Sequence, residues 1–450
     1  MIYVKDIIEK FNGTLICGDI DLVIENISKD TRTINEGDIY IGIKGASFDG
    51  NMFYTDAFDK GAIAVILDNI DVDNIPDKYK DKTIVLVDDT VLCLQQLAKY
   101  KRSLHNIPVI GITGSVGKTS TKDMIASVLE TKYKVLKTLG NNNNHIGLPL
   151  TILRLKDEDV MILEMGMNNK GEISLLTDIA RPTIGVITNV GTAHIGNLGS
   201  RENIMNAKLE IMEGLNGPVI INTDNDIMKD NLDYIKSLGD TITISIDEES
   251  DYKAEIIEEN QFVLEGEEFT SPINTRAFIY NFIMAYVVGK LCNVDIEDIK
   301  KGINNLKLTG NRLEYKEYKD GIMFIDDSYN ASLDSIKSSL EILRKEKCRR
   351  KIAVIGDVLE LGDYSVEIHR EIGKELLASN LDYIITIGEY TKYTDSYLLE
   401  NGYSNLMHFD KESDSYLFIE KLLCKGDTVL FKGSHGMKLN NIVLYLSNNK

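Results

Sequence analysis

The sequence lacks the marks of a disulfide-stabilised, secreted or membrane-spanning protein. Its five cysteines are far apart, and no two have the spacing of a metal or redox pair: Cys17, Cys93, Cys292, Cys348 and Cys424. We therefore expect free thiols in a reducing compartment. No apolar run approaches the roughly 20 residues needed to cross a bilayer, and the opening MIYVKDIIEKFNG lacks the apolar core of a signal peptide. We expect a cytoplasmic protein with no membrane insertion.

Basic residues are also in short supply. The 50 lysines and arginines face 70 acidic residues, a formal net charge of -20. Nucleic-acid binding needs clustered cations to neutralise phosphates, so we exclude that class of partner. A local basic pocket for a phosphorylated small molecule is still compatible with this balance. Hydrophobic residues at 43% can build real cores, and 450 residues predict two or three domains.

Strand and helix patterns divide the chain into three stretches. Up to about residue 106, short apolar runs such as AIAVILD and DKTIVLVDD predict strands, and residues 90–104 predict a helix before Pro108. From Pro108 the order becomes strand, glycine loop and helix, followed by the buried-strand runs VMILEM, TIGVITNV and GPVIIN. This alternation favours a mostly parallel sheet covered by helices. Residues 241–275 resemble short antiparallel strands instead.

The third stretch begins near TGNRLEY and alternates again. GIMFIDDSYN, KIAVIGDV, DYIITIGE and DTVLFKGS predict strands, and SLDSIKSSLEILRK predicts an amphipathic helix. We expect a second α/β domain with a parallel sheet.

The run GITGSVGKTS, residues 111–120, indicates a phosphate-binding loop with unusual spacing. The Walker pattern puts four residues between its first glycine and the Gly-Lys pair, whereas Gly111 is one residue too far and Gly114 two too close. The run is either a plain glycine turn before a capped helix or a compact phosphate loop. The strand before it and the helix after it favour the loop. Lys118 would then contact the β- and γ-phosphates, and the Thr119 hydroxyl would hold Mg²⁺.

Other candidate residues follow strands or lie in polar loops. Glu164, at the end of VMILE, suits a magnesium site or a solvated turn, and the phosphate loop upstream favours the magnesium site. Spacing alone does not separate a ligand-binding His194 from a surface histidine, or a functional Lys208 from a solvated lysine. The amide-rich loop LGNNNNHIGLP, residues 139–149, suits phosphate, peptide or sugar contacts as well as it suits a plain polar loop. FIDDSYNAS and FKGSHGMK read as ligand-facing loops at a sheet edge.

In this order the motifs resemble the Mur ligase family, ATP-dependent enzymes that extend the peptidoglycan stem peptide. The resemblance covers essentially the whole chain, through SKDTRTINEGDIYIGIKGASFDG, TGSVGKTS, EMGMNNKGEI, ITNVGTAHIGNLGSRENI, IDDSYNASLDS, IGDVLELG and KGSHGMKL. It implies an α/β fold of three domains. These are an N-terminal UDP-substrate-binding domain over residues 1–106, a central P-loop ATPase domain with a mostly parallel sheet over 107–309, and a Rossmann-like ligase domain over 310–450.

The resemblance also implies ligands and residue roles. ATP would contact the phosphate loop and three later side chains, with Asn281 at the adenine, Arg312 at the phosphates or ribose and Asp327 at the ribose: Gly114, Ser115, Val116, Gly117, Lys118, Thr119, Ser120, Asn281, Arg312 and Asp327. Mg²⁺ would be held by Thr119 and Glu164, and a second ion by His194, with Lys208 as a carbamate ligand. The catalytic set is Lys118, Glu164, His194 and Lys208. Substrate contacts would come from Ser28, Thr31, Arg32, Lys44, Gly45, Asn143, Asn144, Tyr329 and Asn330.

Within the family, the resemblance is closest to the member that joins D-Ala-D-Ala to UDP-MurNAc-tripeptide through an acyl phosphate. We expect those two substrates, with ATP and Mg²⁺, and a monomer. Five residues depart from that member's usual pattern: His145, Asn169, Tyr280, Leu333 and His435. They leave open a paralogue that adds another amine or dipeptide. A nucleotide-dependent switch is the alternative from another class, although no Asn-Lys-x-Asp guanine-reading run is present. Whether stem residue three is diaminopimelate or lysine is not determined by the sequence.

Overall fold

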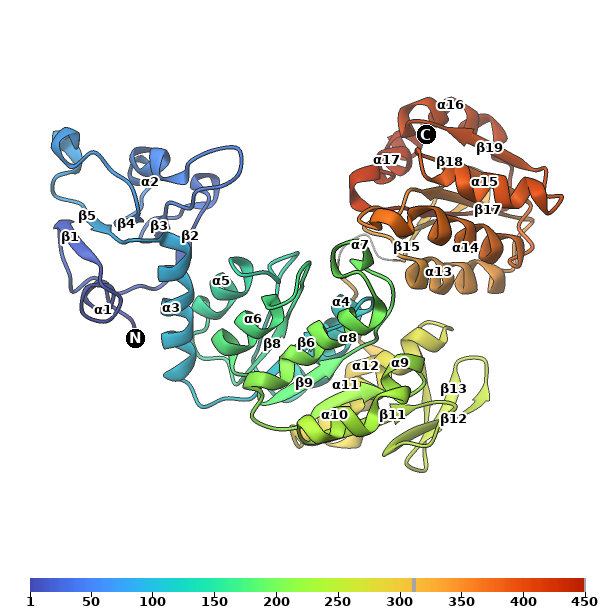
Figure 1. The fold of residues 1–450 in the computed structure, drawn as a ribbon, viewed down its shortest axis with the longest axis horizontal. Coiled ribbons are helices and arrows are strands. Elements are labelled where there is room, and N and C mark those ends of the chain that lie inside the picture. The colour runs from blue at the N-terminus through green and yellow to red at the C-terminus, as the bar shows by residue number, and fades with distance from the viewer. Residues whose placement is uncertain (310–312, 449–450) are drawn as a thin grey trace.

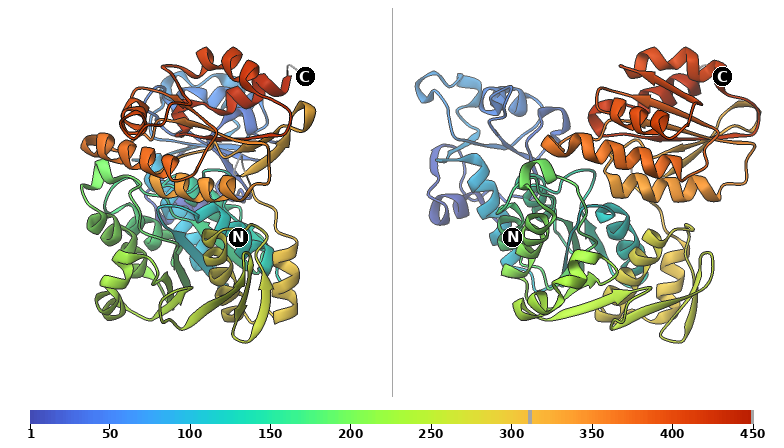
Figure 2. Two further views of the ribbon diagram at one scale, coloured as in Figure 1. Left: turned by 90° about the vertical axis from the view of Figure 1, so that its right-hand side faces the viewer. Right: turned by 45° about the vertical axis from the view of Figure 1, so that its right-hand side comes forward.

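The computed structural model describes residues 1–309 and 313–448. Three β-sheets follow one another along the chain, each with its own helices, and they form three lobes (Figures 1 and 2). The predicted three-part α/β architecture is confirmed. No helix within the described ranges is long and apolar enough to cross a membrane.

The N-terminal lobe contains a five-stranded sheet in the order β1-β5-β4-β3-β2. All neighbours run parallel except β1 and β5. Its elements are α1 (Val4–Lys10), β1 (Thr14–Cys17), β2 (Ile27–Ser28), β3 (Ile39–Ile41), α2 (Tyr54–Asp59), β4 (Ala64–Leu67), β5 (Thr83–Leu86) and α3 (Thr90–Ser103). The carboxylate of Asp89 accepts a hydrogen bond from the Leu92 N–H and so caps α3. This helix packs on α5 (Gly147–Leu153) and α6 (Glu172–Ala180) of the next lobe, which links the two cores.

The central lobe contains nine strands in the order β14-β13-β12-β11-β10-β9-β6-β8-β7. The strands are β6 (Val109–Thr113), β7 (Val135–Lys137), β8 (Val160–Glu164), β9 (Ile184–Ile187), β10 (Val219–Asn222), β11 (Thr241–Ser245), β12 (Tyr252–Glu258), β13 (Gln261–Leu264) and β14 (Glu267–Thr270). The sheet is parallel from β7 to β12, and only β12, β13 and β14 pair antiparallel. The expectation of antiparallel strands from residue 241 was therefore wrong for β11, which adds to the parallel edge after the crossover helix α10 (Leu232–Leu238).

Helices cover both faces of the parallel part of this central sheet, which explains why β6, β8, β9 and β10 are buried along their whole length. The helices are α4 (Lys118–Leu129), α5 (Gly147–Leu153), α6 (Glu172–Ala180), α7 (Ile195–Leu198), α8 (Arg201–Leu209), α9 (Asp226–Asp230), α10 (Leu232–Leu238), α11 (Arg276–Leu291) and α12 (Ile296–Asn304). Ile110 and Ile112 of β6 pack toward α4 and α11, whereas Val109 packs toward the opposite core. Because β6, β8 and β9 are parallel neighbours, the loops that follow them meet at one edge of the sheet.

The C-terminal lobe contains a six-stranded sheet in the order β15-β16-β20-β17-β18-β19, with only β15 antiparallel. Its elements are β15 (Glu314–Glu317), β16 (Met323–Asp326), α13 (Leu333–Lys345), β17 (Arg350–Gly356), α14 (Ser365–Leu377), β18 (Tyr383–Ile387), α15 (Thr391–Glu400), β19 (Leu406–Phe409), α16 (Glu412–Leu422), β20 (Asp427–Lys432) and α17 (Asn440–Asn448). Figure 1 shows α13 and α14 on the side of this sheet that faces the central lobe.

Candidate active site

The phosphate loop is a tight turn between β6 and α4, held in shape by the loop after β9. Gly114 has φ +150° and Gly117 has φ +86°, conformations that side chains rarely adopt. A Cβ at Gly114 would lie 1.8 Å from Thr188 Oγ1. The Thr188 hydroxyl donates to the Val116 carbonyl at 2.6 Å, and the Val116 N–H donates to Asn189 Oδ1 at 3.0 Å. The compact spacing therefore builds a preformed cradle at a helix N-terminus.

Lys118 and the residues around it have the geometry expected of a phosphate site. The Lys118 ammonium donates to the Gly114 carbonyl at 2.7 Å, so the side chain folds back over the loop. The loop residues from Ser115 to Lys118, and Ser120, are half-buried and open to a ligand, whereas Thr119 is buried. The N–H groups of the loop and the α4 dipole suit a polyphosphate here.

Glu164 and Thr119 converge beside this loop. The Thr119 hydroxyl donates to Glu164 Oε2 at 3.1 Å, and the Glu164 N–H donates to Thr138 Oγ1 at 3.0 Å. The other carboxylate oxygen, Oε1, is buried without a hydrogen bond. A buried carboxylate oxygen that lacks a hydrogen bond and lies next to a hydroxyl fits Mg²⁺, which favours one or two protein oxygens together with phosphates. The described ranges contain no cluster of three His, Cys, Asp or Glu residues that could hold a metal without such a ligand.

A fully buried lysine that the sequence analysis did not single out lies behind Glu164. The Lys122 ammonium is 3.5 Å from Glu164 Oε1 and 3.1 Å from Asp123 Oδ1, and the Lys122 side chain is 1% exposed. The ammonium also donates to the Thr138 carbonyl at 3.1 Å. Asp123 accepts from both the N–H and the hydroxyl of Thr309, each at 2.8 Å. The position of Lys122 one turn after Lys118 was the available signal in the sequence, but nothing in that spacing separates Lys122 from a solvated lysine.

Lys208 on α8 is 1% exposed, and no described residue forms a hydrogen bond or ion pair with it. Burial lowers the pKa of its ammonium well below the ordinary value, and the neighbouring charge of Lys118 lowers it further. The side chain therefore favours a neutral, nucleophilic amine. This burial excludes the solvated lysine that the sequence had left open.

His194 precedes α7 and points toward the C-terminal lobe. Its backbone has φ +65°, in the left-handed region, and its Nδ1 lies 2.9 Å from Glu360 Oε2. Burial lowers the pKa of the imidazole, and the charge of Lys118 lowers it further, as would a charged Lys208, against the opposing effect of Glu360. His194 therefore lies within electrostatic reach of both lysines. The sequence contained no signal for the Glu360 contact, because the two residues belong to different lobes.

The amide loop lies against the strand end that carries Glu164. The Gly166 N–H donates to the Asn143 carbonyl at 2.8 Å, and a Cβ at Gly166 would be 2.9 Å from the Asn143 side chain. Asn144 Oδ1 accepts from the N–H groups of Ile146 and Gly147, so that side chain caps α5. Asn143 thus lies beside the strand end that carries Glu164, and the side-chain oxygen of Asn144 is used to cap a helix.

Asn281 and Tyr280 approach the site from α11. Asn281 is buried, and its Oδ1 accepts from the Thr121 hydroxyl at 3.0 Å, one turn after the phosphate loop. The Tyr280 hydroxyl donates to Asp224 Oδ2 at 2.8 Å. Tyr280, one of the five residues that depart from the usual pattern, is therefore hydrogen-bonded to the loop after β10.

The predicted C-terminal residues lie where β16 and β20 end. Asp327 Oδ2 accepts from the buried Lys432 ammonium at 2.5 Å and from the Ser339 hydroxyl at 2.6 Å. The Tyr329 and His435 ring centroids are 5.8 Å apart, which brings two loops of this lobe together. Asn330 Oδ1 accepts from the His435 N–H at 3.4 Å. Arg312 lies outside the described residues.

The predicted N-terminal residues gather at the carboxyl edge of β2 and β3. Ser28 pairs in register with Tyr40 of β3, so the segments after the two strands meet. Thr31 and Arg32 form a short 3₁₀ turn (Thr31–Thr33) there, and Lys44 and Gly45 follow β3. Arg32 is ion-paired with Asp30 at 2.6 Å, and its guanidinium lowers the pKa of that carboxyl to about 2. This group is in another lobe from the phosphate loop.

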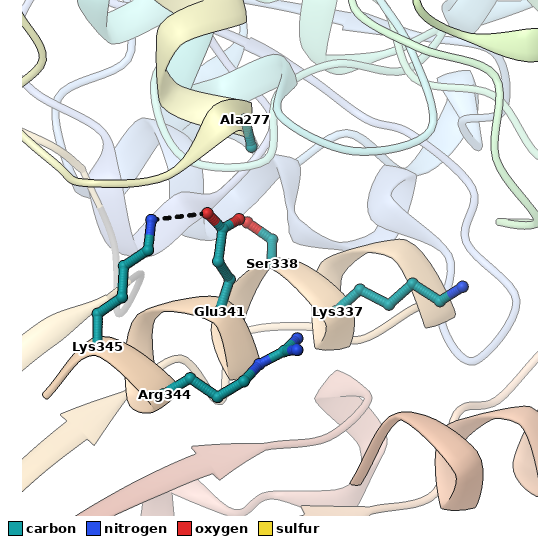
Figure 3. Close-up of a pocket in the computed structure, with 6 residues that line it drawn as sticks. All are labelled: Ala277, Lys337, Ser338, Glu341, Arg344 and Lys345. Atoms are coloured by element: carbon teal, nitrogen blue, oxygen red, sulfur yellow. Dashed lines mark hydrogen bonds and ion pairs between the residues drawn. The ribbon is translucent and has the colours of Figure 1, made fainter. Parts of the chain in front are cut away.

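A crevice separates α11 of the central lobe from α13 of the C-terminal lobe (Figure 3). It is lined by Ala277, Lys337, Ser338, Glu341, Arg344 and Lys345. Lys345 bonds Glu341 at 2.9 Å on its own helix and reaches Asn274 Oδ1 at 3.0 Å across the boundary. This pair is a polar link between the two lobes.

Three more of the five residues that depart from the usual pattern form local contacts. Asn169 donates to Glu172 at the start of α6, and Leu333 is the buried first residue of α13. The backbone carbonyl of exposed His145 accepts from Gln95 of α3 at 3.0 Å. None of these three contacts the phosphate loop through an interaction within the described ranges.

Three family models match the chain in succession. The description "Mur ligase family, catalytic domain" matches residues 23–102, "Mur ligase middle domain" matches 112–289, and "Mur ligase, glutamate ligase domain" matches 311–435.

Individual relatives agree over almost the full length. The UDP-N-acetylmuramoyl-tripeptide–D-alanyl-D-alanine ligase of Bacillus subtilis is 38% identical over 98% of this chain and 97% of its own. The enzyme of the same name from Synechocystis is 35% identical over 95% and 92%. Among solved structures, MurF from Acinetobacter baumannii has a TM-score of 0.86 at 29% identity over 96% of this chain and 95% of that one. MurF from Thermotoga maritima in complex with ADP has a TM-score of 0.80 at 28% identity over 96% and 99%.

Proposed function

Because this chain belongs to the Mur ligase family, we propose that it is a UDP-N-acetylmuramoyl-tripeptide–D-alanyl-D-alanine ligase. It joins D-Ala-D-Ala to the terminal carboxylate of UDP-MurNAc-tripeptide, with conversion of ATP to ADP and phosphate, in peptidoglycan precursor synthesis. The observation that carries the proposal is the preformed phosphate loop with Lys118 folded over it and the Thr119–Glu164 pair beside it. The substrates are inferred from the names of relatives that match this chain over almost its full length.

The first step makes the carboxylate reactive. A carboxylate oxygen of the tripeptide attacks the γ-phosphorus of ATP, ADP leaves, and an acyl phosphate forms. Lys118 and the loop N–H groups stabilise the charge on the transferring phosphoryl group. Thr119 and Glu164 would hold one Mg²⁺, with His194 at a second, and the ions when bound neutralise phosphate charge.

The second step forms the amide. The amine of D-Ala-D-Ala attacks the acyl carbon, a tetrahedral intermediate forms, and phosphate leaves as the amine loses a proton. Water would destroy the acyl phosphate, so the amide loop with Asn143 and Asn144 and the loop with Tyr329 and Asn330 have to close around it.

Lys208 is proposed to act as a carbamate. Its neutral amine adds CO₂ and releases a proton, which turns an amine into an anionic oxygen ligand. The burial of this side chain without a partner supports that modification, because an unpaired buried ammonium is costly.

The three lobes divide the remaining work. Residues 1–106 would hold the UDP end through Ser28, Thr31, Arg32, Lys44 and Gly45, residues 107–309 would hold ATP, and residues 310–450 would hold the nucleotide ribose and the incoming amine. Asn281 would meet the adenine and Asp327 the ribose, and Arg312 is assigned to the phosphates or ribose. We also propose a cytoplasmic monomer.

Two other functions are tested by the same assay. A paralogue would accept another amine or a dipeptide ending in D-Ser or D-lactate, and a nucleotide switch would hydrolyse ATP without either substrate. Purified protein is incubated with ATP, Mg²⁺, UDP-MurNAc-tripeptide and a panel of amines and dipeptides, and phosphate release is measured. We expect release that requires both the tripeptide and D-Ala-D-Ala. Release with D-Ala-D-Ala no faster than background would overturn the proposal.

A further inference from the structure

We propose that Glu360 of the C-terminal lobe is a positioning residue that orients the His194 imidazole for Mg²⁺. The metal site would then be completed by a residue from each side of the boundary between two lobes. The inference rests on the proposed function, because His194 matters here as a metal ligand.

The contact fixes which nitrogen of His194 is available. Glu360 Oε2 lies 2.9 Å from Nδ1, and no described residue bonds Nε2. An ionised carboxylate only accepts, so Nδ1 carries the proton and Nε2 keeps its lone pair. Metal-binding histidines characteristically donate their other ring N–H to a carboxylate or carbonyl in this way, which sets the tautomer and the ring orientation.

Two more contacts make this pair part of a docked surface. The Tyr364 hydroxyl donates to the Gly199 carbonyl at 2.5 Å, at the other end of α7. Between them, Gly196 lies against the loop of Glu360 so closely that a Cβ would be 2.6 Å from the Glu360 carbonyl oxygen and 2.7 Å from the Gly362 nitrogen. The segment 360–364 therefore follows the whole length of α7.

The loop is held equally well from its own lobe. The Val358 N–H donates to His369 Nε2 at 3.1 Å, and the Leu359 N–H donates to Ser434 Oγ at 2.9 Å. Glu360 itself has φ +63°, a conformation that costs a non-glycine residue of order 1–3 kcal/mol and persists where the surroundings impose it. An isolated surface ion pair would need none of this support.

The test uses Mn²⁺ as a probe for Mg²⁺ in the full-length protein with a non-hydrolysable ATP analogue. Pulsed electron paramagnetic resonance detects a histidine nitrogen bound to Mn²⁺, and His194→Ala defines the signal that belongs to this residue. Glu360→Ala is expected to weaken Mn²⁺ binding at this site by about 10–100-fold. Glu360→Gln, whose amide oxygen still accepts from Nδ1–H, is expected to lose far less. Glu367→Ala is the matched control, because Glu367 is exposed on α14 and no hydrogen bond or ion pair joins it to α7 within the described ranges.

Gly196→Ala tests the docking without altering either partner. The added methyl group should separate the 360–364 loop from α7 and reproduce the Glu360→Ala loss, and an unchanged unfolding temperature would show that the variant is folded. Wild-type Mn²⁺ affinity in Glu360→Ala overturns the inference. Tighter Mn²⁺ binding in that variant also overturns it, because Glu360 would then compete with the metal. A wild-type protein that gives no His194 signal overturns it as well. Phosphate release that depends on D-Ala-D-Ala is measured on the same protein preparations with ATP in place of the analogue, so failure of the proposed function is seen separately.

Discussion

Two lysines of the central lobe are almost fully buried, and their surroundings favour opposite charge states. Lys122 faces Glu164 and Asp123 and is bonded by backbone and hydroxyl oxygens, as a buried cation must be. Lys208 has no such partner among the described residues, and its pKa is lowered by burial and by Lys118. The same residue type thus serves as a fixed charge at one position and as a neutral amine at the other.

Lys208→Ala is expected to abolish ligation, and added bicarbonate is expected to restore nothing, because alanine has no amine to carbamylate. Phosphate release with both substrates is the measurement. Lys236→Ala, at an exposed lysine on α10 with no partner within the described ranges, should retain wild-type rates. Near-normal turnover of Lys208→Ala would show that the carbamate assignment is wrong.

At the scale of elements, α4 connects the phosphate site to the segment that leads into the C-terminal lobe. Its first residues hold the loop, Lys122 faces Glu164, and Asp123 bonds Thr309. These contacts form a continuous chain from the metal-side carboxylate to the end of the central lobe.

Lys122→Met should lower the unfolding temperature strongly, since it leaves two buried carboxylates without their cation, a loss of about 3–5 kcal/mol. Mg²⁺ with ADP should stabilise the variant more than it stabilises the wild type, because the ion restores positive charge beside Glu164. Thermal unfolding with and without Mg-ADP measures both effects. Lys301→Met, exposed on α12, is the control and should change stability by no more than about 0.5 kcal/mol. A wild-type melting curve for Lys122→Met would contradict this account.

The loop after β17 depends on a buried histidine. His369 accepts from the Val358 N–H through Nε2, and its Nδ1 lies 2.7 Å from the Ser365 carbonyl, so the ring is neutral. Burial lowers its pKa, and Asp357 opposes that shift.

This histidine predicts acid sensitivity with a definite sign. Its pKa is lower in the folded state than the value near 6.5 of an unfolded chain, so protons bind the unfolded state first. Stability should therefore be full above about pH 6.5, fall as the pH drops below it, and level off below the folded-state pKa. Denaturant unfolding between pH 5 and 8 should show a smaller slope in His369→Gln than in the wild type. His145→Gln, at an exposed position, should keep the wild-type slope.

At the scale of the whole molecule, the proposed ligand groups lie in three lobes that meet only through the central one. No hydrogen bond or ion pair joins the N-terminal to the C-terminal lobe in residues 1–309 and 313–448, and Figure 1 shows them apart. Each boundary with the central lobe has a crevice. One is lined by α11 and α13, and the other contains Asn26 and Asp38 of the first lobe with Arg154 and Lys156 of the second.

We expect the molecule to contract when UDP-MurNAc-tripeptide and a non-hydrolysable ATP analogue bind together. A ligand that touches two lobes stabilises their closed arrangement by its differential affinity. Small-angle scattering should show a smaller radius of gyration with both ligands than with either alone. An unchanged radius would mean that the lobes already have their catalytic arrangement.

Many of the strands and helices could be predicted from the periodicity of apolar residues and from the glycine and proline residues between them. The strands around VIGIT, VMILE and IGVI and the helix after Gly117 followed from apolar runs and the glycine loop. The parallel pairing of β11 could not be predicted, since a five-residue strand with threonine at alternate positions suits either direction. The roles of Glu164, His194 and Lys208 in catalysis stay predictions, as do the domain boundaries.

The sequence by itself determined the family, the three-part α/β fold and the phosphate loop, because these depend on local conformation and on motifs in a fixed order. Only the tertiary structure decided which lysine is an ion-paired cation and which a neutral amine, because charge state depends on burial and on partners distant in the chain. The same holds for Glu360 beside His194, 166 positions apart and in different lobes. Such contacts leave no trace in the spacing of residues, since they form only when separately folded lobes meet.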